Sequence, residues 1–271
     1  MDGFEAKVRE LMRGGYDLHV HAAPSHSKRA VDDFELARQL DEYGMAGAIT
    51  KCHYEPTGAR AAIANKYSCA KARLFGAIAL NRPVGGINPY AAESALKLGA
   101  KMVWLPTKDV KAGLKVVDEN GALLPQVYEV FDVVKKFGAY LATGHITPAE
   151  SDAVIRAGLK EGVNMILTHP DSKSVAAPLE MQLALAKEGA MIEKTWGNVH
   201  NGHISAEAMV ESIKLIGSEH VFLVTDFGQA DSPMPVQGIH DFVSALLRGS
   251  IRESDIITML RTNPARIVGE L

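Results

Sequence analysis

A regular alternation of short apolar runs with longer amphipathic segments extends along the whole chain and constrains its fold more than any other feature. The runs recur at intervals of about 25–35 residues, which is the size of a strand–helix unit. Their bounds are 16–21, 46–52, 74–80, 101–105, 139–143, 163–168, 190–194 and 221–225. Strands that are buried on both faces have this continuous apolar character. The sequence therefore predicts eight parallel strands connected by helices.

This pattern favours a single α/β domain over residues 1–271, folded as a (β/α)8 TIM barrel. A length of 271 residues is common for such barrels. An open, doubly wound sheet is the alternative, because periodicity alone does not distinguish the two. A helix over 4–12 precedes the first strand and is expected to close the bottom of the barrel. Residues 114–124 form a predicted hairpin around Asn120 and Gly121, after the fourth strand.

Composition and charge exclude several classes of function. The net charge is −3, so nothing supports binding to nucleic acid. No apolar run is long enough to span a membrane, and the first residues lack the apolar core of a signal peptide. The two cysteines, Cys52 and Cys69, rule out a disulfide framework. We therefore expect a cytoplasmic enzyme with a small-molecule substrate, and a homo-oligomer is compatible with the sequence.

The distribution of histidine locates the predicted active site. Eight of the ten histidines lie at predicted strand ends or in the loops just after them: His19, His21, His26, His53, His145, His169, His200 and His203. In α/β barrels the active site is built at this end of the strands. Asp226 follows the eighth strand and belongs to the same set. His220 lies toward the opposite face, and His240 lies in the last connection.

The spacing of His19 and His21 has a direct physical interpretation. Residues i and i+2 of a strand point to the same side, so both imidazoles can face the barrel axis and bind one metal ion. Imidazole suits zinc, iron and related divalent metals. Asp226 could add an oxygen ligand and accept a proton from metal-bound water, whose pKa falls to about 7. Lys51 and His53 are also two residues apart, at the end of the second strand, so both side chains could point inward beside His19 and His21.

These residues resemble the ligand pattern of the amidohydrolase superfamily. The similar elements are His19-Val20-His21, His145, His169, Asp226 and the closing segment 260–269. The resemblance implies a distorted barrel that holds one or two divalent metals, zinc first, with iron or manganese as alternatives. It implies that His19 and His21 bind the first metal. It also implies that His145 and His169 bind a second metal, or that one of them binds and the other polarises the substrate, and that Asp226 is both ligand and general base.

One position departs from the pattern of that superfamily. Many two-metal members bridge their ions with a carboxylated lysine or a glutamate at the end of the fourth strand. Here that strand ends Trp104-Leu105-Pro106-Thr107-Lys108. Lys51, on the second strand, is the substitute candidate, as a carboxylated bridge, a binder of a substrate anion or an ordinary lysine at the rim. We assign Asp226, His169 and Lys51 as candidate catalytic residues.

The resemblance implies hydrolysis of an amide, ester, lactone or phosphoester. A mononuclear decarboxylase or lyase on the same barrel is the first alternative, and a seven-stranded phosphoesterase that also begins with His-x-His is another. A barrel that binds a metal or ligand without catalysis is the alternative outside enzymes. Candidate substrate contacts are His53, Arg82, His200 and His203; Arg29 and Arg60 are further loop arginines that could hold an anion.

Overall fold

The computed structural model describes residues 3–271, in which eight parallel strands follow one another in sequence order. The strands are β1 (Tyr16–His21), β2 (Gly47–Lys51), β3 (Arg73–Ala79), β4 (Ala100–Trp104), β5 (Tyr140–Ala142), β6 (Asn164–Leu167), β7 (Met191–Thr195) and β8 (Val221–Val224). The sequence-based bounds differ from these by no more than one residue. The predicted barrel is therefore confirmed, and the eight strands exclude the seven-stranded alternative.

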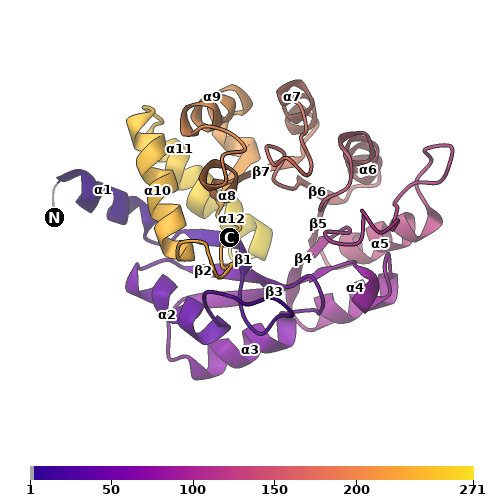
Figure 1. Cartoon of the computed structure of the whole chain (residues 1–271), viewed down its shortest axis with the longest axis horizontal. Coiled ribbons are helices and arrows are strands. Elements are labelled where there is room, and N and C mark those ends of the chain that lie inside the picture. The colour runs from indigo at the N-terminus through magenta and orange to yellow at the C-terminus, as the bar shows by residue number, and fades with distance from the viewer. Residues whose placement is uncertain (1–2) are drawn as a thin grey trace.

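Helices follow the strands and surround them (Figure 1). They are α1 (Gly3–Met12), α2 (Asp33–Glu42), α3 (Gly58–Tyr67), α4 (Pro89–Lys97), α5 (Pro125–Lys136), α6 (Pro148–Lys160), α7 (Leu179–Lys187), α8 (Trp196–His200), α9 (Ala206–Ile216), α10 (Pro235–Arg248), α11 (Glu253–Ile257) and α12 (Asn263–Val268). Short 3-10 segments η1 (Arg82–Val84) and η2 (Ser218–His220) and a π-helical segment η3 (Thr258–Thr262) complete the chain. Capping boxes fix the first turns of α2 and α6, where Asp32 and Thr147 accept from the backbone of Glu35 and Glu150.

Two apolar layers hold the barrel together. Alternate strand residues such as Leu18, Ile49 and Phe222 fill the interior. Their neighbours along the strands, such as Ala48 and Leu223, pack against the helices in a larger outer layer. The alternation is the period-2 pattern of side chains on a strand. It directs every second side chain at the ends of β2 and β7 toward the barrel axis.

The bottom of the barrel is closed by α12, which corrects the expectation for the first helix. Ala265, Ile267 and Val268 of α12 belong to the interior apolar layer. Helix α1 instead packs beside α10 and α11, at the edge of the molecule (Figure 1). Because α1 buries only a narrow stripe along one side, it covers the outer layer and does not enter the barrel.

The barrel closes between β1 and the residues just after β8. The Asp226 amide donates to the His19 carbonyl at 2.9 Å, and the His21 amide donates to the Phe227 carbonyl at 2.8 Å. The buried Asp17 carboxylate accepts from the Thr225 amide at 3.1 Å and from its hydroxyl at 2.5 Å. This closure brings Asp226 beside the two histidines of β1.

Residues 114–124 form the expected hairpin, with Val117 and Leu123 paired antiparallel. The Asp118 amide donates to the Ala122 carbonyl at 2.8 Å, and Gly121 adopts a positive φ of 81° that the turn requires. Cys52 and Cys69 are both free thiols. Among residues 3–271, no helix combines the length and apolar character needed to cross a membrane.

Candidate active site

An irregularity in β1 directs His19 and His21 into the barrel. The pairing register of β1 with β2 shifts between Asp17 and Val20. As a result Leu18 faces the apolar interior, while His19, one residue further on, also faces inward and lies 5.3 Å from the Trp104 ring, centroid to centroid. Register shifts of this kind re-aim side chains and are frequent beside active sites. His21, two residues after His19, then points into the same space.

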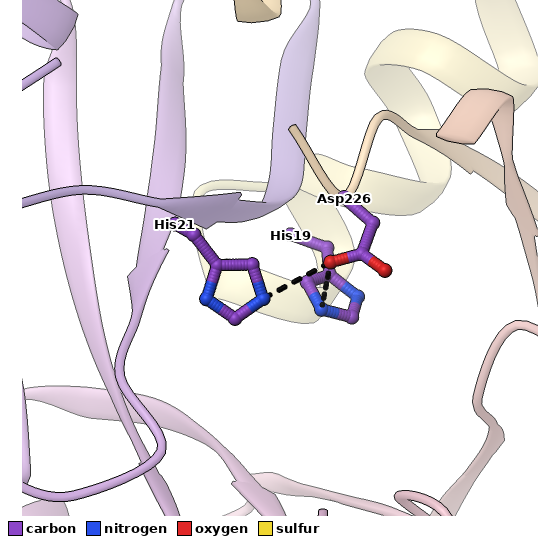
Figure 2. A group of neighbouring side chains, drawn as sticks. All are labelled: His19, His21 and Asp226. Carbon is purple, nitrogen blue, oxygen red and sulfur yellow. Dashed lines mark ion pairs between the residues drawn. The ribbon is translucent and has the colours of Figure 1, made fainter. Parts of the chain in front are cut away.

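His19, His21 and Asp226 form a compact set of metal-ligand types. Each offers one ligand atom, and these atoms lie within 4.8 Å of one another. Asp226 Oδ1 is 3.2 Å from His19 Nε2 and 3.0 Å from His21 Nε2. Figure 2 shows both imidazoles with a nitrogen turned toward the same carboxylate oxygen. Two imidazole nitrogens and a carboxylate oxygen are a donor set that suits zinc and related ions.

Glu193 of β7 holds the other side of His19. Its Oε1 lies 2.9 Å from His19 Nδ1 and also accepts from the His169 amide at 3.1 Å. Metal-bound histidines usually donate their second N–H to a carboxylate or carbonyl in this way. The sequence analysis missed Glu193. The signal was present, since Glu193 and Lys194 are charged residues within an otherwise apolar predicted strand.

Lys51 lies inside the site and not at the rim. It is 1% exposed, and its Nζ is 2.7 Å from His19 Nε2 and 4.8 Å from the centroid of the Trp104 ring. Burial lowers the pKa of Lys51. Burial and Lys51 also act to lower the pKa of His19, but Asp226 and Glu193 outweigh them and raise it to about 9. A short contact thus joins the Lys51 amine to the same His19 nitrogen that faces Asp226.

Five imidazoles form a closed ring around the mouth of the barrel. The centroid distances between neighbouring rings are 5.5 Å for His19 and His21, 4.9 Å for His21 and His53, and 6.2 Å for His53 and His145. The ring closes through His145 and His169 at 4.7 Å and through His169 and His19 at 5.9 Å. The site thus unites histidines from the ends of β1, β2, β5 and β6.

Most of these imidazoles are held neutral. Burial lowers the pKa of His21 to about 3. Burial likewise lowers the pKa of His53, His145 and His169. Burial acts to raise the pKa of Asp226, but His19 and His21 outweigh it and hold that pKa well below its usual range. The cluster therefore presents neutral ring nitrogens around a carboxylate.

The tautomer of His53 is set by Asn81 and Thr107. Asn81 Oδ1 accepts from the Thr107 and Lys108 amides at 2.8 and 3.0 Å, so its Nδ2 must be the atom that donates to Thr107 Oγ1 at 2.8 Å. The buried Thr107 hydroxyl then has one partner left for its proton, His53 Nδ1 at 2.7 Å. His53 accordingly carries its own proton on Nε2, as a donor.

His169 follows β6 on a loop that is tied to β7. Its φ is +23°, a conformation that non-glycine residues rarely adopt, and its Nδ1 lies 3.1 Å from Ser172 Oγ. The fully buried Lys194 anchors the same loop, because its Nζ is 2.9 Å from Asp171 Oδ2. Strain at His169 is therefore maintained by contacts on both sides of the loop.

The structure does not bring every candidate substrate contact to the ring of imidazoles. Arg82 is exposed and donates to the Ala112 carbonyl, so it holds the segment before the hairpin. His200 is exposed at the end of α8, with its ring 5.3 Å from Phe227, and His203 lies 3.4 Å from Asn198 Oδ1. Of the four candidates, only His53 belongs to the ring of five imidazoles. Loop residues have no periodicity, so the sequence did not indicate which of these four side chains points into the site.

Comparisons with known proteins agree with this architecture. The model of a family described as Family of unknown function (DUF6282) matches residues 14–193, more than half of the chain. No curated protein gives a significant match to the sequence. Among solved structures, an amidohydrolase from Pseudomonas aeruginosa is 14% identical, with 98% of each chain covered and a TM-score of 0.69.

Two further solved structures differ in their named reactions. A probable 2-pyrone-4,6-dicarboxylic acid hydrolase from Acinetobacter baumannii is 12% identical, covers 94% of this chain and 99% of its own, and has a TM-score of 0.64. A dihydroxybenzoic acid decarboxylase from a Polaromonas species, with bound manganese, is 14% identical, covers 95% and 97%, and has a TM-score of 0.62. The expected likeness to amidohydrolases is confirmed at the level of the fold.

Proposed function

The chain belongs to the family of unknown function DUF6282, and from its site we propose that it is a metal-dependent hydrolase of small molecules. The observation that carries the proposal is the convergence of His19, His21 and Asp226 at the strand ends. We propose zinc as the metal, with iron or manganese as alternatives, and an amide, ester, lactone or phosphoester as the bond cleaved. A reducing cytoplasm fits the two free thiols.

The residues present fit a divalent ion. Asp226 Oδ1 and the Nε2 atoms of His19 and His21 would hold it, and a three-ligand set leaves room for water or substrate. When His19 is neutral, its Nε2 lone pair and the Asp226 carboxylate are two acceptors 3.2 Å apart, which a cation between them stabilises. A bound ion supplies a water of lowered pKa and polarises the bond to be cleaved.

The protein groups have separable tasks in this proposal. Asp226 contacts both histidines through Oδ1, and its side chain is 27% exposed, so Oδ2 can accept a proton from water at the mouth. Glu193 orients His19 from behind. The neutral rings of His145 and His169 lie across the site from His21, where they can orient the substrate or bind a second ion. The Lys51 amine contacts His19 Nε2, and this contact would be replaced by the ion when an ion binds.

A decarboxylase is the second candidate function. Among residues 3–271, the ligand atoms of His19, His21 and Asp226 form the one group close enough to hold an ion, and β4 ends at the apolar Trp104 without a bridging side chain. A site for one ion suits this alternative, and two of the similar structures are named as decarboxylases of dihydroxybenzoates. Release of carbon dioxide without consumption of water would favour this reaction over hydrolysis.

Metal content per chain is the first test of the proposal. Protein purified without chelator should carry about one or two equivalents of zinc, iron or manganese by mass spectrometry. His19→Ala should lose this metal, whereas the control His220→Ala, in η2 before β8, should keep it. Turnover of an ester, lactone, amide and phosphoester panel should disappear in His19→Ala and Asp226→Asn. Metal without any turnover would indicate a binding protein, and no metal after reconstitution would refute the proposal.

A further inference from the structure

Arg29 lies on the loop after β1 and is fixed near Asp226 by backbone pairing. Arg29 and Gln229 form an antiparallel bridge, and the Ala30 amide donates to the Gly228 carbonyl at 2.9 Å. Gly228 has a φ of +109°, and a Cβ there would lie only 1.7 Å from the carbonyl oxygen of His21. This close packing leaves the backbone of Arg29 little freedom relative to the candidate metal ligands.

The guanidinium of Arg29 is half-buried and lacks a partner of opposite charge. Its Nε is buried without a hydrogen bond, and no carboxylate in the described part of the chain forms an ion pair with it. Burial lowers the pKa of Arg29, and the attraction of Asp226 offsets this only in part. A desolvated cation without a counter-ion costs free energy, and an anionic ligand would offset that cost.

The other two loop arginines are already occupied. Arg60 forms an ion pair with Asp33 and donates to the carbonyls of Ala22 and Ala23 at 2.9 and 2.6 Å. Arg82 donates to Ala112, away from the site. Arg29 differs from both, because its buried Nε has no hydrogen-bond partner.

A hollow formed in part by the loop that carries Arg29 provides space for a ligand. It has a volume of about 300 Å³ and is lined by Pro24, Ser25, His26, Cys52, Tyr54 and Glu55. Pro24, Ser25 and His26 belong to the loop between β1 and α2, which also carries Arg29. The hollow follows the end of β2, and the Tyr54 ring on its wall lies 6.1 Å from the His53 ring, centroid to centroid, so a molecule bound here would lie close to the ring of imidazoles.

We propose that Arg29 forms an anion subsite that binds a carboxylate group of the substrate. One guanidinium balances the single charge of a carboxylate and can donate two parallel hydrogen bonds to its oxygens. That the bound molecule is the substrate rests on the proposed function, since its reacting bond would then lie over His19, His21 and Asp226. A phosphate group carries more charge than one guanidinium balances, so the carboxylate is the better match.

The test compares benzoate with benzamide, which have the same shape and differ in charge, by calorimetric titration of the metal-loaded full chain. Wild type should bind benzoate about tenfold more tightly than benzamide. Arg29→Met should abolish this preference, and Arg29→Lys should keep part of it, because the charge remains and the two-pronged geometry is lost. Arg82→Met is the matched control and should retain the wild-type preference. Arg29→Lys also keeps the test decisive if Arg29→Met does not fold.

The outcomes separate this subsite from the metal proposal. Benzoate also binds metal ions, so the titrations are repeated after chelation, and the part of the preference that depends on Arg29 should persist. No preference in wild type, or an unchanged preference in Arg29→Met and Arg29→Lys, overturns the subsite even if the protein holds a metal. Tighter binding of inorganic phosphate than of benzoate overturns the carboxylate assignment. If the protein binds no metal but its preference for benzoate over benzamide depends on Arg29, the proposed function is refuted and the subsite is retained.

Discussion

Glu193 Oε1 and His19 Nδ1 lie 2.9 Å apart deep inside the barrel, and neither side chain is exposed to solvent. The carboxylate holds the proton of a neutral His19 on Nδ1, so that Nε2 presents its lone pair toward Asp226. The orientation of a candidate ligand on β1 therefore depends on a residue of β7, behind the site.

Replacement of Glu193 by Gln should weaken metal binding while preserving the fold. Glutamine has the same shape and can still accept from His19, but it lacks the negative charge that raises the basicity of the imidazole. We expect zinc affinity to fall by about 10- to 100-fold, measured by competition with a fluorescent chelator. Glu188→Gln, on the surface after α7, is the control and should bind zinc as wild type does. Equal affinities in all three proteins would remove Glu193 from this role.

Thr107→Val tests the assignment of the His53 tautomer. In wild type labelled with 15N-histidine, the two ring nitrogens of His53 should have the shifts of a neutral imidazole protonated on Nε2. Valine removes the hydroxyl that donates to Nδ1, so the two tautomers should interconvert and the difference between the shifts of the two nitrogens should become smaller. The unfolding free energy should also fall by about 1–3 kcal/mol, because one N–H of Asn81 Nδ2 loses its acceptor while the other still donates to the His53 carbonyl. An Nδ1-protonated His53 in wild type would show that the network runs in the opposite direction.

The strands and the inward histidines could be predicted because they depend on local periodicity. The run 16–21 appears in the structure with the same bounds, and the shared parity of Lys51 and His53 does bring both beside the histidines of β1. The parity rule also gave the correct side for His19, although the register shift in β1 makes its neighbour Leu18 face inward too. Sequence alone contains no signal for such a shift.

Contacts between distant segments explain what the sequence analysis did not find. Glu193 acquires its role from His19, which lies 174 residues away, and Thr107 acquires its role from Asn81 and His53, in the loops after two other strands. Arg29 and Arg82 are equivalent in sequence as loop arginines. They differ only in whether the folded chain supplies a partner for the guanidinium.

Lys51→Met should retain the metal stoichiometry of wild type and bind metal more tightly at low pH. The Lys51 amine lies 2.7 Å from His19 Nε2, so its proton and a metal ion compete for the same position. Zinc affinity measured from pH 6 to 8 should therefore depend less on pH in the variant. Metal content reduced by half would contradict this expectation and would identify Lys51 as a carboxylated bridge between two ions.

Asp17 should make the stability of the metal-free protein depend on pH. Burial raises its pKa to about 7, although hydrogen bonds from Thr225 oppose the shift. In the unfolded chain an aspartate titrates near about 3.9. At a pH between these two pKa values, Asp17 is protonated in the folded protein and ionised in the unfolded chain. The resulting stabilisation is fully present below about pH 4 and is lost as the pH rises through about 7.

Asp17→Asn isolates this contribution, because asparagine mimics the protonated carboxyl and can donate to Thr225 Oγ1, which lies 2.5 Å from Oδ2 in wild type. The unfolding free energy of the variant minus that of wild type should increase between about pH 4 and pH 7, by a few kcal/mol, and then level off. Urea denaturation of both proteins in the presence of chelator measures the difference. A difference that stays constant over this range would mean that Asp17 is ionised in the folded state throughout, and that the bonds from Thr225 outweigh its burial.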